Sequence, residues 1–216
     1  VDAVYRGLQR HGWTAFGEPV EYREAEFHVR QVVAVGPDGL VLAIIQRYSP
    51  PVPALDDPAL GMTPIFNSTQ MVRDFERSAR FYAAALGWQK THDFLIDAAA
   101  EPGADVLGLP LPQASTARRR IGIFRAPDSI DGSIELIANT SMSGRDFTAD
   151  CIAPNVGLLS LRFRVRDAAQ YAIDVQRRGV QLQGRLERYE LAPYGMVASF
   201  TVRAPEGAQL EFLTPD

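Results

Sequence analysis

Three stretches of the chain share one pattern, a turn rich in Pro and Gly followed by a run of apolar residues. Residues 36–45 read GPDGLVLAII, residues 204–213 read APEGAQLEFL, and residues 126–137 read APDSIDGSIELI. Proline fixes φ at a turn position and glycine supplies a positive φ, so each stretch predicts a turn that leads into a strand. The recurrence indicates an internal repeat.

The two later stretches also share a beginning. Residues 70–74 and 161–167 are extended runs that end at Asp74 and Asp167, and each aspartate is suited to cap the helix predicted after it. Apolar residues then recur at helical spacing, and Gly87 and Gly179 lie where helix C-caps are expected. Residues 1–12 resemble the same helix without a preceding strand.

After each helix the pattern changes to the alternation of a strand, so each repeat predicts the order β-α-β-β-β. The predicted fold class is therefore α+β, built from tandem modules. The expected parts are an incomplete module without its first strand (1–50), a Pro-rich linker (51–62), a module (63–140), a connection (141–155) and a module (156–216). The missing strand is expected either from residues before Val1 or from a second chain, and the second alternative predicts a homodimer.

Composition excludes several classes of protein. The 216 residues are 46% hydrophobic and 22% charged, which is typical of a globular chain. A net charge of -4 argues against a nucleic-acid partner and gives no attraction to an anionic membrane. The longest apolar runs have the length of a strand, too short to span a bilayer. The single Cys151 cannot form a disulfide within the chain, so a cytoplasmic location is expected.

Residues 74–88, DFERSARFYAAALGW, together with the ending PEGAQLEF, resemble the glyoxalase, bleomycin-resistance and extradiol-dioxygenase superfamily (the vicinal oxygen chelate fold). The resemblance implies paired modules whose sheet curls into a half-open, barrel-like structure around a cleft. It also implies an enzyme of the lyase, isomerase or dioxygenase type, acting on a small organic molecule in that cleft. The alternative is a metal-free protein that binds and sequesters a small molecule, as bleomycin-resistance proteins do.

The resemblance further implies a divalent metal, held by a residue on a module's first strand and a Glu on its last strand. Carried over by position, the ligands are Asn67, Ser160, Glu135 and Glu211. The family usually has His or Gln on the first strand, and none of the three histidines, His11, His28 and His92, falls at these positions. The remaining all-oxygen set suits Mg, Mn or Ca. The missing histidines favour the metal-free alternative, whereas the retained Glu135 and Glu211 favour the enzyme.

Glu135 and Glu211 are also the candidate catalytic residues. Each lies in an apolar strand, and alternation places its side chain on the face opposite the neighbouring Ile134 and Leu136, or Leu210 and Phe212. Because a carboxylate facing a cleft needs a cation, a donor or a raised pKa, each Glu is expected to be a metal ligand, a general base or the partner of an arginine.

The candidate substrate-binding residues are Arg162, Arg164, Tyr194 and Met196. Arg162 and Arg164 alternate with apolar residues, so one of them either pairs with Glu211 across the cleft or holds an anionic substrate. Tyr194 and Met196, close to Tyr189, lie at a Pro-Tyr-Gly turn, where they either contact an apolar or aromatic ligand or only pack. The three consecutive arginines at 118–120 are interpreted as a solvated strand edge.

Overall fold

The structure is a computed structural model that describes residues 1–15, 17–24, 26–51, 61–63, 65–97, 117–126, 132–141, 143–158 and 160–216. The chain forms two compact units. The N-terminal unit contains Val1–Thr63 and Ile96–Arg118, and the C-terminal unit contains Pro64–Leu95 and Arg119–Asp216. Most of the predicted Pro-rich linker lies outside the described residues, and the predicted module boundaries stay predictions. No helix within the described residues is long and apolar enough to cross a membrane.

The N-terminal unit begins with a helix and continues as an antiparallel sheet. Its elements are α1 (Asp2–Gln9), β1 (Thr14–Ala15), β2 (Val20–Glu24), β3 (Phe27–Val35) and β4 (Val41–Ser49). Strand β3 pairs with the other three strands. The helix packs Tyr5 into a small core with Val32 and Ala34, and Arg30 donates two hydrogen bonds of 2.7 and 2.8 Å to Asp2.

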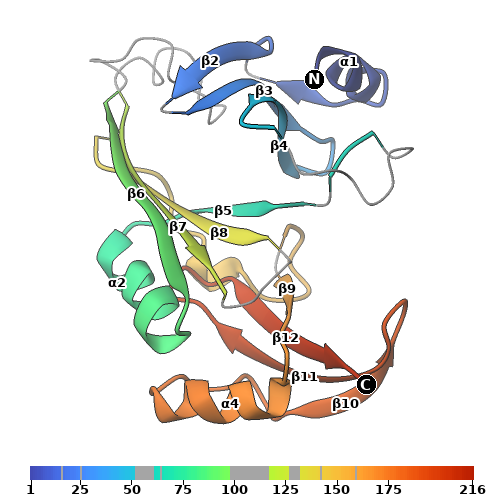
Figure 1. Cartoon of the computed structure of the whole chain (residues 1–216), viewed down its shortest axis with the longest axis vertical. Coiled ribbons are helices and arrows are strands. Elements are labelled where there is room, and N and C mark those ends of the chain that lie inside the picture. The colour runs from blue at the N-terminus through green and yellow to red at the C-terminus, as the bar shows by residue number, and fades with distance from the viewer. Residues whose placement is uncertain are drawn as a thin grey trace. The chain divides into compact units, whose positions relative to one another are not determined.

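The C-terminal unit contains two sheets of identical topology (Figure 1). The first is formed by β5 (Asn67–Met71), β6 (Gln89–Asp97), β7 (Arg118–Arg125) and β8 (Ser133–Asn139), with the order β5-β8-β7-β6. The second is formed by β9 (Ser160–Arg164), β10 (Glu187–Leu191), β11 (Gly195–Arg203) and β12 (Gln209–Pro215), with the order β9-β12-β11-β10. In each, the last strand pairs in parallel with the first. The predicted α+β class with open sheets is confirmed.

Along the chain, a helix follows the first strand of each sheet. After β5 comes α2 (Phe75–Arg80) with the π-helical turn η2 (Phe81–Ala85), and after β9 comes α4 (Ala168–Arg177). The predicted caps are confirmed, because Asp74 and Asp167 each accept a 2.9 Å hydrogen bond from the backbone N–H three residues later. The sequence predicts one uniform helix up to residue 86. In the structure its last turn is wider, and Leu86 N donates to Phe81 O at 2.9 Å.

One core joins the two sheets of the C-terminal unit. Trp88, from the segment after η2, lies 5.1 Å from the Phe163 ring of β9, and its Nε1 donates to Tyr171 Oη of α4 at 3.0 Å. The residues that flank Glu135 and Glu211 along their strands, Ile134, Leu136, Leu210 and Phe212, are fully buried in this core. The two carboxylates therefore lie on the faces of their sheets that point away from the core.

Candidate functional site

Glu211 on β12 forms an ion pair with Arg162 on β9. The two strands run in parallel with Glu211 directly opposite Arg162, and the arginine donates from Nε at 2.8 Å and from Nη2 at 2.7 Å to Glu211 Oε2. The predicted pairing between these residues is present. It forms between neighbouring strands of one sheet, because the register alone brings the two side chains together.

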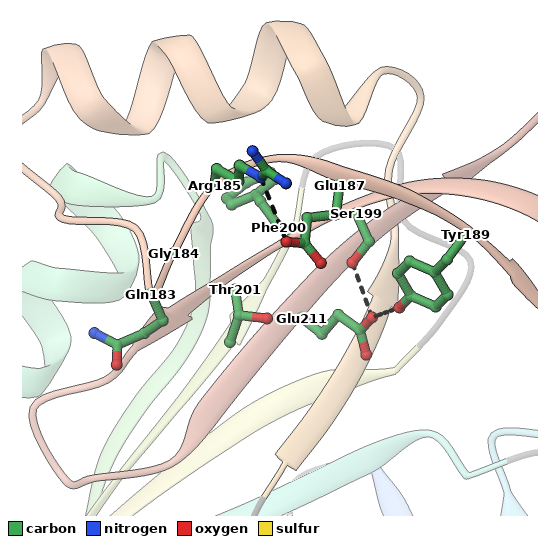
Figure 2. A pocket seen from close by; sticks show the side chains of 9 residues that line it. All are labelled: Gln183, Gly184, Arg185, Glu187, Tyr189, Ser199, Phe200, Thr201 and Glu211. Carbon is green, nitrogen blue, oxygen red and sulfur yellow. Dashed lines mark hydrogen bonds and ion pairs between the residues drawn. The ribbon is translucent and has the colours of Figure 1, made fainter.

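The second oxygen of Glu211 is also engaged. Ser199 Oγ of β11 donates to Oε1 at 2.8 Å, and Tyr189 Oη of β10 donates to the same oxygen (Figure 2). Only 12% of the Glu211 side chain is exposed. Burial raises the pKa of Glu211, but the hydrogen bonds from Tyr189, Arg162 and Ser199 together outweigh this effect, so its pKa is lowered. The carboxylate is therefore ionised at neutral pH.

Tyr189 is the partner of Glu211 that keeps its proton. Burial raises the pKa of the Tyr189 phenol, and the hydrogen bond to the Glu211 carboxylate raises this pKa further. At neutral pH the pair consists of a phenol that donates and a carboxylate that accepts. This arrangement fixes the orientation of both groups.

A cavity of about 440 Å³ opens beside this cluster (Figure 2). Arg185 and Glu187 on its wall form an ion pair of 3.6 Å, and hydroxyl and amide groups complete a mostly polar lining. This volume suits a small organic molecule. The lining residues are Gln183, Gly184, Arg185, Glu187, Tyr189, Ser199, Phe200, Thr201 and Glu211.

Glu135 on β8 occupies the matching position in the other sheet of the C-terminal unit. Thr69 on β5 lies directly opposite it and donates to Oε2 at 2.6 Å, as Arg162 does to Glu211. Asn67 Nδ2 donates to the same oxygen at 3.2 Å. The structure thus brings together Asn67 and Glu135, two of the four residues that the resemblance assigned to a metal.

The donor set does not fit the divalent metal that the resemblance implies. Both oxygens of Glu211 accept hydrogen bonds, and one faces a guanidinium, which repels a cation. Asn67 presents its NH₂ group to Glu135, while its Oδ1 accepts from Ser133 at 3.0 Å. Within the described residues, no group of three or more His, Cys, Asp or Glu side chains is arranged to hold a metal ion.

The remaining candidates lie elsewhere on the sheet of β9 to β12. Ser160 is exposed opposite Gln209, and Arg164 lies half-buried opposite Leu213. Tyr194, in the turn before β11, and Met196, at the start of β11, are 39% and 45% exposed and are not among the residues that line the 440 Å³ cavity.

Sequence reasoning missed Ser199, Thr201, Gln183 and Arg185 as parts of the site. A signal exists for the first two, because Ser199 and Thr201 alternate with the buried Phe200 and Val202 and so share the face of Glu211. Nothing in the local pattern around Gln183 and Arg185 indicates a site, since the approach of this loop is set by tertiary structure.

Comparison with known proteins agrees with the family resemblance found in the sequence. The family model described as Glyoxalase/Bleomycin resistance protein/Dioxygenase superfamily matches residues 65–212. No curated protein matches the chain. Among solved structures, a point mutant of glyoxalase I from Zea mays is 18% identical with a TM-score of 0.61, covering 100% of this chain and 64% of that chain. A glyoxalase family protein from Bacillus cereus is also 18% identical, with a TM-score of 0.52, covering 70% and 93%.

These structural likenesses show the fold alone, and the chain spans less than two thirds of the Zea mays protein. The family match is more informative, because it extends over both sheets of the C-terminal unit, including Glu135 and Glu211. The chain belongs to the glyoxalase/bleomycin resistance protein/dioxygenase superfamily.

Proposed function

We propose that this chain is a metal-independent member of the superfamily that binds a small, polar, uncharged organic molecule in the cavity beside Glu211. The observation that carries the proposal is the complete engagement of the Glu211 carboxylate by Arg162, Ser199 and Tyr189. A metal ligand must offer a lone pair, and here both carboxylate oxygens already accept hydrogen bonds.

The charges around the cavity support an uncharged ligand. Glu211 is neutralised by Arg162, and Glu187 by Arg185, so no unpaired charge attracts an anion or a cation among these four groups. Hydrogen-bonding groups of Thr201 and Gln183 remain on the wall, with the Phe200 ring as an apolar surface. Such a lining suits a molecule with carbonyl or hydroxyl groups on a small apolar frame.

The experiment that tests metal independence is elemental analysis of protein purified without an affinity tag or a chelator. We expect no stoichiometric Mn, Fe, Ni or Zn, and no uptake on dialysis against these metals. Near-stoichiometric metal that is lost in Glu211→Gln would overturn the proposal.

Ligand binding is tested with uncharged and charged fragments of one size, benzamide and benzoate, by ligand-observed NMR. We expect benzamide to bind more tightly than benzoate, and Thr201→Trp, which fills the cavity, to abolish binding. Tyr194→Trp adds a comparable ring outside the cavity and serves as the control. Tighter binding of benzoate would contradict an uncharged ligand.

The second candidate is an enzyme in which Glu135 or Glu211 moves a proton. The specific observation in its favour is the Tyr189–Glu211 pair on the cavity wall, a donor and an acceptor held at the point where a ligand would lie. Under this proposal, Glu211→Gln and Tyr189→Phe would leave ligand affinity within a few-fold and abolish turnover. Retained turnover in both variants and in Glu135→Gln would exclude it.

The proposal includes a cytoplasmic homodimer. Within the described residues β4 pairs only with β3, whereas β8 and β12 each have a second, parallel neighbour. A strand edge leaves backbone groups available to another chain. Sedimentation equilibrium should give twice the 23.8 kDa chain mass, and a monodisperse monomer would contradict the dimer.

A further inference from the structure

A second cavity, of about 490 Å³, lies in the C-terminal unit, and Glu211 is not among its lining residues. Its wall combines α2 and η2 with the end of α4, η3 (Thr148–Asp150) and the turn between β11 and β12. Three arginines from three separate segments line it, Arg77, Arg178 and Arg203. The chain segments that supply them are far apart in sequence, so only the tertiary fold brings these side chains to one place.

None of the described residues that line this arginine cavity is acidic. Across the part of the chain that the structure describes, none of the three arginines forms an ion pair with a carboxylate. Glu206, which follows the lining residue Pro205 in the chain, interacts electrostatically with Arg77. Its carboxylate is already held by Ser78 Oγ at 3.0 Å and by the Tyr82 hydroxyl. The cavity therefore carries a net positive charge, in contrast to the neutralised cavity beside Glu211.

Two of the arginines are held in place by backbone carbonyls. Arg178 Nη1 donates to Leu86 O at 3.2 Å, and Arg203 Nη2 donates to Thr148 O at 2.7 Å. A guanidinium has five N–H donors, so each of these contacts leaves further donors for a ligand. Holding the side chains in advance lowers the entropy cost of binding.

Apolar side chains lie beside the charges. Phe81 and Ala85 come from η2, and Val180 and Pro205 from the segments after α4 and β11. Guanidinium groups bind phosphate and carboxylate through paired hydrogen bonds, and an apolar surface next to them favours a ligand with a hydrocarbon or aromatic part.

We propose that this arginine cavity is a second binding site, which takes a small organic anion with a phosphate or carboxylate group next to an apolar group. The anionic group contacts Arg77, Arg178 and Arg203, and the apolar group lies against Phe81 and Ala85. The site shares the lining residue Gln183 with the cavity beside Glu211, but none of its arginines lines that cavity, and it does not depend on the function proposed there.

The test uses phenyl phosphate as the probe and isothermal titration calorimetry as the readout. We expect phenyl phosphate to bind at least about tenfold more tightly than inorganic phosphate or phenol, because only the ester addresses both the arginines and the apolar surface. Arg77→Gln, Arg178→Gln and their combination should each weaken binding, the double variant by at least about tenfold.

Arg80→Gln is the matched control, since it removes the same charge from α2 at an exposed residue that does not line the cavity. Arg77 makes no side-chain hydrogen bond to a described residue, so Arg77→Gln is expected to fold even if Arg178→Gln does not. Equal weakening by Arg80→Gln would mean a general effect of net charge and would overturn the proposal. So would the absence of binding at millimolar phenyl phosphate, or binding that is lost in Thr201→Trp but kept in the Arg77→Gln/Arg178→Gln variant.

Discussion

Glu206, at the turn between β11 and β12, connects the sheet of β9 to β12 to the helical segment α2–η2. It accepts hydrogen bonds from Ser78 of α2 and from the hydroxyl of Tyr82, which is fully buried in η2. Burial raises the pKa of Glu206, and the hydrogen bonds offset only part of this effect. Burial and the adjacent Glu206 charge raise the pKa of Tyr82 well above its usual value. The phenol therefore acts as a permanent donor across the module boundary.

We predict that Tyr82→Phe destabilises the protein by about 1–3 kcal/mol at pH 7, because it leaves the Glu206 carboxylate with one donor fewer in a buried place. Since the folded pKa of Tyr82 lies above the unfolded value of about 10, its contribution is present below pH 10 and is lost as the pH rises further. The loss of stability above pH 10 should thus be shallower in the variant, as measured by urea denaturation. Tyr194→Phe, at an exposed hydroxyl, is the control and should change little.

Asp93 on β6 has a lowered pKa, in contrast to Tyr82, so its effect on stability changes at acid pH. Arg120 donates to both of its oxygens at 3.0 Å, and Lys90 donates at 2.6 Å. The hydrogen bonds from Arg120, and then from Lys90, lower the pKa of Asp93 to about 2. A lowered pKa means that the folded state binds the proton less tightly than the unfolded state does, so the contribution is present above the unfolded pKa and lost as the pH falls through about 2.

Asp93→Asn should therefore cost about 1 kcal/mol at pH 7, a value reduced for the partial exposure of the pair. The difference from the original protein should disappear as the pH approaches 2. Urea denaturation at several pH values measures this, with Asp150→Asn, at an exposed residue without an ion pair to any described residue, as the control. A constant difference between pH 7 and pH 2 would contradict the assignment.

The arginines at 118–120 show where residue-level reasoning fails. The interpretation as a solvated strand edge is wrong, because β7 lies between β8 and β6 in its sheet and the Arg119 side chain is fully buried. Arg120 lies 4.2 Å over the Phe75 ring in addition to its acidic partners, and Arg118 pairs with Asp97 at 2.8 Å. Consecutive residues of a strand point to opposite faces, so a run of like charges cannot all face solvent when one face of the sheet is covered.

At the scale of elements, the two sheets of the C-terminal unit repeat one arrangement. In each, the glutamate of the last strand lies directly opposite a donor on the first strand, Thr69 for Glu135 and Arg162 for Glu211. The parallel register of these strand pairs fixes the contact. The donor is a threonine in one sheet and an arginine in the other. The partner of the carboxylate is therefore a hydroxyl group in the first sheet and a cation in the second.

The end of η2 offers a test of a single glycine. Gly87 has a φ of +76°, and a Cβ there would lie 2.8 Å from Arg178 Nη1. Gly179 has a φ of +88° with nothing within 4 Å of such a Cβ. Gly179→Ala should thus cost about 1–2 kcal/mol for the left-handed backbone alone. Gly87→Ala should cost more, because Arg178 must also move.

Thermal denaturation followed by circular dichroism measures both glycine variants. The larger loss in Gly87→Ala should shrink in an Arg178→Gln background, since a shorter side chain no longer opposes the new methyl group. Equal losses of stability in the two glycine variants would show that contact between the new methyl group and Arg178 does not destabilise the protein.

At the scale of the whole molecule, the second and third modules share one hydrophobic core. Phe200 of β11 lies 5.2 Å from Phe212 and 5.8 Å from Tyr171, and Tyr171 accepts the hydrogen bond from Trp88. Residues from both sheets and both helices belong to this core. Neither sheet buries its apolar face without the other module, so the two are expected to unfold together.

We predict that Phe200→Ala lowers the free energy of unfolding by about 3–5 kcal/mol as reported by Trp88, although the two residues belong to different modules. A Trp13→Phe background leaves Trp88 as the only tryptophan, so its fluorescence in urea reports on the second module. Ile173→Ala, at a 44% exposed residue of α4, is the control. An unchanged Trp88 transition in Phe200→Ala would mean that the modules unfold independently.

The sequence by itself determined the order of elements, the caps at Asp74 and Asp167, and the face on which Glu135 and Glu211 lie. These features depend on turn chemistry and on the periods of helix and strand, which are local and are written into consecutive residues. The same pattern supported the fold class and the family.

Only the tertiary structure decided what each of these side chains contacts. Strand register set Arg162 against Glu211, the hairpin of β10 and β11 brought Tyr189 and Ser199 to the same carboxylate, and packing of the modules gathered Arg77, Arg178 and Arg203. Contacts of this kind join residues far apart in the chain, and their free energy depends on burial and distance that no local pattern contains. The type of each candidate group was thus predictable, whereas its partner, and with it the chemistry of the site, was not.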